Sequence, residues 1–146
     1  MATNFTKSWK TEVGINHVPA YQASGRPFAS ASVIYDTTAR VVPLPYVSRW
    51  FQIINRGESA LRVGFSAHGV AGIAGTSGDE NLYFQVEASG STGYGKSEIY
   101  EMKVSEIWLY GATAGTCDVV SGLTTIPSQR TNTSDGTSWS GSAGVG

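Results

Sequence analysis

The chain has 146 residues, a mass of 15.4 kDa and a formal charge of −1, so one domain with one core fits its length and no general attraction to nucleic acid is expected. Cys117 is the single cysteine, which excludes an intrachain disulfide framework. Charged residues make up only 14% of the sequence whereas glycine occurs 18 times, a composition typical of an all-β protein with many turns.

The beginning of the sequence, residues 1–10, contains no apolar signal core. Nowhere does an apolar run approach the roughly eighteen residues that a membrane-spanning helix needs. We therefore expect a protein made in a cytosol, with no membrane insertion and no nucleic-acid contact.

Alternation of apolar and polar residues with a period of two dominates the chain and predicts strands. In residues 60–66, for example, Leu61, Val63 and Phe65 share one face. Residues 49–55 are apolar on both sides, which is typical of a strand covered on both faces. The phase of the alternation changes near Ser105 and predicts a bulge or a strand end there. In chain order, the predicted strands are 5–13, 31–36, 38–44, 49–55, 60–66, 81–88, 98–104 and 116–121.

Eight or nine strands in a domain of this size allow an immunoglobulin-type sandwich, a closed barrel or a jelly roll. The immunoglobulin framework of two cysteines is impossible here, and long glycine-rich connections at residues 67–79 and 89–95 favour the jelly roll. We therefore predict an all-β, eight-stranded antiparallel jelly-roll sandwich at residues 29–123. An N-terminal strand and arm (1–28) and an extended C-terminal tail (124–146) are expected to lie outside it.

A search for catalytic chemistry finds no constellation of acid, base and nucleophile. The histidines, His17 and His68, lie in separate loops without nearby carboxylates at metal-ligand spacing. Cys117 lies in an apolar strand, where a buried thiol is an inert small hydrophobe. The glycine-rich residues 69–75 lack the Lys-Ser/Thr of a phosphate loop and are expected to be flexible. We expect no catalytic residue, no metal and no cofactor, and the protein is not expected to be an enzyme.

Arginines and aromatic residues occur together around Arg49, Trp50 and Arg62. Such a group can stack nucleic-acid bases or sugar rings. Because the net charge is close to zero, we favour the interpretation in which the aromatic residues fill the core and Arg49 and Arg62 contribute to a subunit interface.

The last sixteen residues, 131–146, consist mostly of glycine, serine and threonine, which is a composition typical of disorder. We expect another molecule to hold this segment in place. The simplest candidate is a neighbouring subunit that contacts Trp139 and Val145.

Six segments follow one another in a recognisable succession: 49–51 (RWF), 60–66 (ALRVGFS), 81–84 (NLYF), 106–111 (EIWLYG), 119–127 (VVSGLTTIP) and 139–146 (WSGSAGVG). In this succession, which spans about residues 45–146, the chain resembles the penton capsid proteins of large icosahedral double-stranded DNA viruses, notably those of algae. The resemblance implies a structural protein of the virion capsid, made in the host cytoplasm. It also implies a homopentamer at each five-fold vertex, with the neighbouring major capsid protein and minor capsid proteins as further partners.

Two alternatives remain open. The chain can be a carbohydrate-binding jelly-roll module, in which Tyr21, Tyr46, Tyr94 or Trp108 stacks on sugar rings, or a receptor-binding spike domain. A glycan-binding module works as a monomer, whereas a capsid protein assembles, so the oligomeric state separates these alternatives.

Overall fold

The computed structural model describes residues 14–15, 25–72, 81–90 and 93–146. Helix α2 (Ala67–Ala71) follows the fourth strand, and the 3-10 helix η2 (Ser128–Thr131) follows the last. The described residues form eight strands, which in chain order are β1 (Arg26–Tyr35), β2 (Arg40–Pro43), β3 (Tyr46–Asn55), β4 (Leu61–Gly64), β5 (Tyr83–Val86), β6 (Gly95–Lys96), β7 (Glu106–Gly111) and β8 (Gly115–Pro127).

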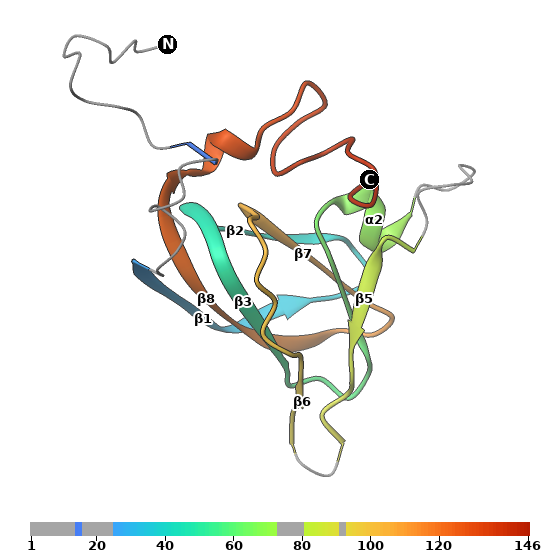
Figure 1. Cartoon of the computed structure of the whole chain (residues 1–146). Helices are drawn as coiled ribbons and strands as arrows, with labels where there is room; N and C mark the ends of the chain where they lie inside the picture. The colour runs from blue at the N-terminus through green and yellow to red at the C-terminus, as the bar shows by residue number, and fades with distance from the viewer. Residues whose placement is uncertain (1–13, 16–24, 73–80, 91–92) are drawn as a thin grey trace, which may run out of the picture.

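These strands form two four-stranded antiparallel sheets that face each other (Figure 1). The order is β1-β8-β3-β6 in the first sheet and β2-β7-β4-β5 in the second. The prediction of an all-β fold with two antiparallel layers is therefore confirmed. The chain leaves β8 at the end of the sandwich where η2 lies, and its last residue lies beside α2.

The core lies between the two sheets and is built by the alternation that the sequence displays. Leu61 and Val63 of β4, and Ile107 and Leu109 of β7, are fully buried. An aromatic group centred on Phe51 joins the layers: its ring lies 6.1 Å from Phe65, 6.5 Å from Phe84 and 5.7 Å from Tyr100. Burial of this apolar surface is the main source of stability for the sandwich.

The prediction of a regular strand at residues 98–104 is wrong. This segment runs along β3, but its pairing is confined to the bridge between Phe51 and Tyr100 and to single hydrogen bonds such as Ser48 N to Val104 O. The reason lies in β3, whose register with β8 shifts around Ser48 and interrupts a regular ladder. Beyond Ser105 the chain enters the second sheet as β7, which explains the predicted change of phase.

The observed strands differ in length from the predicted ones. Strand β8 continues to Pro127, six residues beyond the predicted end at 121, and β1 begins at Arg26 rather than at 31. The two-residue strand β6 begins at Gly95, the last residue of the segment 89–95 that the sequence predicts as a loop. In β3, one face is buried, whereas Trp50 and Ile54 on the other face are only half-buried, so the prediction of two covered faces is wrong. The predicted strand at 5–13 lies outside the described residues.

Helix α2 replaces part of the loop that was expected to be flexible. The Ser66 hydroxyl caps the helix by accepting from the amide of Gly69, and Val70 is fully buried. Val70 packs so closely on β4 that a Cβ added to Gly64 would lie 2.7 Å from its Cγ1 atom. The expectation of a loop is therefore wrong for residues 69–71, and His68 lies on this helix rather than in a loop. Residues 73–75 lie outside the described ones.

Candidate subunit interface

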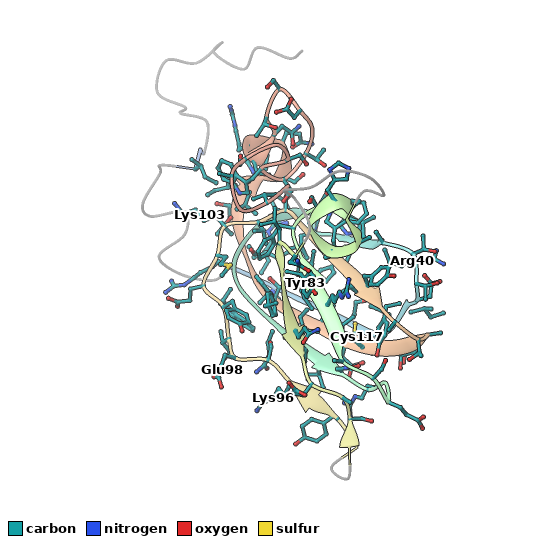
Figure 2. The ribbon with its side chains drawn as sticks, turned by 90° about the vertical axis from the view of Figure 1, so that its right-hand side faces the viewer. Arg40, Tyr83, Lys96, Glu98, Lys103 and Cys117 are labelled. Atoms are coloured by element: carbon teal, nitrogen blue, oxygen red, sulfur yellow. The ribbon has the colours of Figure 1, made fainter. Side chains whose placement is uncertain are left out.

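The C-terminal closing segment (residues 132–146) folds back over its own chain. Trp139 packs against the core, and its indole Nε1 donates to the carbonyl oxygen of Lys103 over 2.6 Å. At the end of the segment, Ser66 Oγ donates to the Val145 carbonyl oxygen over 2.6 Å. Figure 2 shows Lys103 at the end of the molecule where this segment lies. Trp139 and the Val145 carbonyl therefore have partners within the chain.

Buried hydroxyl groups anchor the beginning of the closing segment. Ser105 and Thr131 are joined by a hydroxyl–hydroxyl hydrogen bond of 2.7 Å, and the Ser138 hydroxyl accepts from the amides of Ser105 and Glu106 over 3.2 Å each. Thr131 and Ser138 are both completely buried. The hydroxyl groups of this segment therefore find partners in the same chain, so its composition alone does not require another molecule to hold it.

The outer surface of the second sheet carries a row of aromatic side chains around one arginine. The Arg62 guanidinium lies 4.6 Å from the ring centroid of Tyr83 and 5.1 Å from that of Tyr110. On β7, Trp108 alternates with the buried Ile107 and Leu109, so it shares this outer surface. Val41 of β2, which is opposite Trp108 in the ladder, is 43% exposed. We call this surface, made by Val41, Arg62, Tyr83, Trp108 and Tyr110, the aromatic face.

Part of the outer surface of the first sheet, over β1, β8 and the middle of β3, is largely apolar and hollowed. Gly122 lies between Pro27 of β1 and Trp50 of β3 in the ladder, and because it has no side chain it leaves a gap between them. The resulting depression has a volume of about 290 Å³ and is also lined by Ala29 and Val120. We call this surface, made by Pro27, Ala29, Trp50, Val120 and Gly122, the groove face.

Both faces are unusual for the outside of a sandwich. In an antiparallel two-layer fold, the outward side chains are typically polar because they meet water. Contiguous apolar surface on a soluble protein marks an interaction site, and tyrosine, tryptophan and arginine are the residues most enriched where proteins bind each other. The geometry therefore indicates two candidate interfaces, one on each sheet.

The four residues predicted from the sequence for a subunit interface are not brought together. Arg62 lies on the aromatic face, whereas Trp139 and Val145 belong to the closing segment. Arg49 lies 3.7 Å from a carboxylate oxygen of Glu101 in the same chain. The sequence did not predict the groove face. Its signal is the small residues Gly122 and Ala29 near Trp50, which become neighbours only once the pairing of the strands is known.

Two carboxylates near the first sheet form hydrogen bonds and ion pairs within the chain. The pKa of Asp118 is lowered mainly because its Oδ1 accepts from the backbone amide of Ser32, and the Arg56 guanidinium 2.9 Å away lowers it further. The pKa of Asp36 is likewise lowered, in its case first by the Arg40 side chain and then by the Thr38 amide. Both groups therefore stay ionised at neutral pH and stabilise local loops rather than perform proton transfer.

Reactive groups are scarce in the described part of the chain. Burial raises the pKa of the Cys117 thiol to about 12, with the charge of Asp118 adding to the effect, so the thiol stays protonated at neutral pH. No group of three or more histidine, cysteine or acidic residues that could hold a metal ion occurs among the described residues. His17 lies outside them. The described helices include none with the length and apolar character needed to cross a bilayer.

Comparison with known proteins gave no match: no protein-family model, no curated protein and no solved structure is significantly similar to this chain.

Proposed function

We propose that this protein is a structural jelly-roll subunit of a virion capsid that forms homopentamers at the five-fold vertices. Support for the jelly roll comes from strand pairing. Among the described strands, β1 pairs with β8, β2 with β7, β3 with β6, and β4 with β5. This nested pairing is what a long hairpin produces when it wraps into two four-stranded sheets, as in a jelly roll.

The observation that carries the assembly is the pair of outer faces. The groove face and the aromatic face belong to different sheets, so they lie on opposite sides of the sandwich. A subunit with two different contact surfaces on opposite sides binds a neighbour through each of them. Contacts of this kind build a closed ring when the rotation between neighbours divides a full turn.

The virion role is supported by the resemblance of residues 45–146 to penton capsid proteins and by the balance of charge. With a net charge of −1, copies that pack side by side repel each other little. The proposed partners are further copies of this chain, then the neighbouring major capsid protein and minor capsid proteins.

Native mass spectrometry and sedimentation velocity of the purified full chain test this proposal. We expect a particle of five times the chain mass of 15.4 kDa. A chain that stays monomeric up to high micromolar concentration, or that forms a stable dimer as its largest species, would contradict the proposal.

A second candidate function, glycan binding, is favoured by one observation. The stacked arrangement of Tyr83, Arg62 and Tyr110 offers ring faces and a cation, which are the groups that bind sugars and sugar acids. Titration of the monomeric protein with a panel of neutral and acidic oligosaccharides tests it. Saturable binding that is lost in Tyr110→Ala would support this function over assembly, and absence of binding would exclude it.

A further inference from the structure

We propose that the groove face of one copy binds the aromatic face of the next, so that every subunit contact in the assembly is of the same head-to-tail kind. This inference rests on the proposed assembly into rings and names the surfaces that would form it. The occupant of the groove is therefore a second copy of this chain.

The depression on the groove face is large enough to hold an aromatic ring. The groove depression of about 290 Å³ exceeds the volume of about 150 Å³ in which an apolar protein cavity holds a benzene ring. The aromatic face supplies side chains of that kind, since Trp108 and Tyr110 alternate outward along β7 and Val41 projects beside them. An apolar depression on one side of the molecule and outward aromatic side chains on the opposite side can fit each other between copies.

Both sheets extend from one end of the sandwich to the other, so the positions of charged side chains on them can be compared along that direction. The closing segment marks one end, and Figure 2 shows Lys96 toward the other end. On the first sheet, Arg26 lines the depression and lies over the ring of Tyr46, whose pairing partner Pro127 directly precedes η2, and Lys96 projects at the far end beside Ile54. Among the described residues, neither cation has an ion-pair partner.

Two carboxylates lie at the corresponding heights on the other side of the sandwich, one on β7 and one directly after the end of β5. Glu106 lies near the closing segment, where its Oε1 accepts from Thr137 over 2.7 Å. Glu87 lies at the far end, where its carbonyl oxygen accepts from the Asn55 side chain over 3.0 Å, and its side chain is exposed. Two copies can lie side by side in the same orientation, with the groove face of one against the aromatic face of the next. Arg26 of the first copy then lies at the same height as Glu106 of the second, and Lys96 lies at the same height as Glu87. Opposite charges therefore align in the parallel orientation, which is the orientation that subunits of a ring adopt.

An isologous contact, in which each face binds its own counterpart, lacks this complementarity. If two groove faces bound each other, Arg26 and Lys96 of one copy would lie against Arg26 and Lys96 of the other. Such like-charge contacts oppose association. Head-to-tail contact is therefore the arrangement that both shape and charge favour.

Two variants that block one face each test the inference. Ala29→Arg places a long charged side chain over the depression, and Val41→Arg does the same on the aromatic face. Both positions are exposed in edge strands, so the fold is expected to be retained, which far-ultraviolet circular dichroism checks. Ala112→Arg, an exposed loop position outside both faces, is the matched control.

We expect each blocked variant alone to be monomeric and Ala112→Arg to assemble like the unmodified chain. An equimolar mixture of Ala29→Arg and Val41→Arg is expected to form a heterodimer and nothing larger, because one intact face of each kind remains. Native mass spectrometry with one variant isotopically labelled measures this. Dimers of a single variant would overturn the inference in favour of isologous contacts.

The result also separates this inference from the proposed function. If the unmodified chain forms pentamers but the mixture stays monomeric at the same concentration, the pairing of these faces is wrong and the capsid proposal stands. If the unmodified chain is a monomer, both fail. Charge reversal gives a second readout: Lys96→Glu and Glu87→Lys should each raise the concentration needed for assembly severalfold, and the double variant should restore it. A double variant no better than either single one would overturn the charge alignment.

Discussion

The phenol of Tyr35 donates a hydrogen bond of 2.7 Å to the side-chain oxygen of Asn55, and both residues are completely buried. The same oxygen accepts from the amide of Gly57 over 2.9 Å, and the Asn55 amide group donates to the carbonyl oxygens of Ser59 and Glu87. Asn55 therefore ties β3 to the loop before β4 and to the end of β5. This network connects the two sheets at the end opposite the closing segment.

Substitution of Tyr35 and substitution of Asn55 should lower the free energy of unfolding by different amounts. Tyr35→Phe leaves the Asn55 oxygen with its other donor, so we expect a loss of about 1 kcal/mol in the free energy of unfolding. Asn55→Ala leaves several buried backbone groups without partners and should cost about 3 kcal/mol. Urea unfolding measures both. Equal losses for the two variants would show that the hydrogen bonds of Asn55 to the backbone contribute little.

The free energy of unfolding should fall at alkaline pH because two buried weak acids, the thiol of Cys117 and the phenol of Tyr35, lie close together. Burial raises the pKa of Cys117 to about 12, and burial together with the charge of Cys117 raises the pKa of Tyr35. In the unfolded chain the thiol ionises near pH 8.5, so the unfolded state binds fewer protons than the folded state above that pH. The free energy of unfolding should therefore be constant from pH 6 to 8 and decrease above pH 9.

Cys117→Val isolates the contribution of the thiol. Its loss of unfolding free energy between pH 8 and pH 10 should be smaller than that of the unmodified chain, with Tyr35 accounting for the remainder. Urea unfolding at the two pH values measures the difference. An identical loss in both proteins would contradict the assignment to Cys117.

At acid pH the hydrogen bond from Ser32 to Asp118 should weaken. The pKa of Asp118 is lowered first by the Ser32 amide and then by Arg56, so the folded state favours the carboxylate. The associated stability is present above the unfolded pKa near 3.9 and is lost as pH falls below it. Ser32 has a φ of 57°, a left-handed conformation that this hydrogen bond helps to hold.

Hydrogen exchange of the Ser32 amide measures this effect. Asp118→Asn should speed exchange at Ser32 about tenfold or less at pH 6, because the acceptor loses its charge but keeps an oxygen. Asp36→Asn, a matched carboxylate outside this contact, should leave Ser32 unchanged. Equal exchange rates in all three proteins would exclude a role for Asp118 in holding the left-handed conformation of Ser32.

Trp139 should hold the closing segment on the body of the protein. Trp139→Ala removes half-buried aromatic surface and the hydrogen bond to Lys103, with an expected cost of about 2 kcal/mol for local opening. Trypsin cleavage after Arg130 should accelerate at least tenfold, while the sheets keep their circular dichroism signal. Trp139→Phe, which keeps the ring packing, should accelerate cleavage less. Unchanged cleavage in Trp139→Ala would show that the hydroxyl groups of Ser105, Thr131 and Ser138 suffice.

The alternation of residues was sufficient to predict the all-β class and most strand positions. Leu61 and Val63 are buried as their spacing predicts, because each strand is long enough to show its period. Residues 98–104 show the same alternation yet do not form a regular strand. Their pairing depends on the bulged register of β3, which is a tertiary property that local sequence does not encode.

The candidate interfaces were less accessible to sequence reasoning. Arg62 was identified from its proximity to other aromatic and basic residues, but its contacts with Tyr83 and Tyr110 come from strands far apart in the chain. The composition of the C-terminal residues was a poor guide to their structure for a related reason. Composition counts the apolar area that a segment can bury, whereas Thr131 and Ser138 are held by hydrogen bonds to Ser105 and Glu106.

The mass of the full chain in solution tests the central claim most directly. Native mass spectrometry should find a particle of five copies, each of 15.4 kDa. A single-copy mass at every concentration up to the solubility limit would contradict the account.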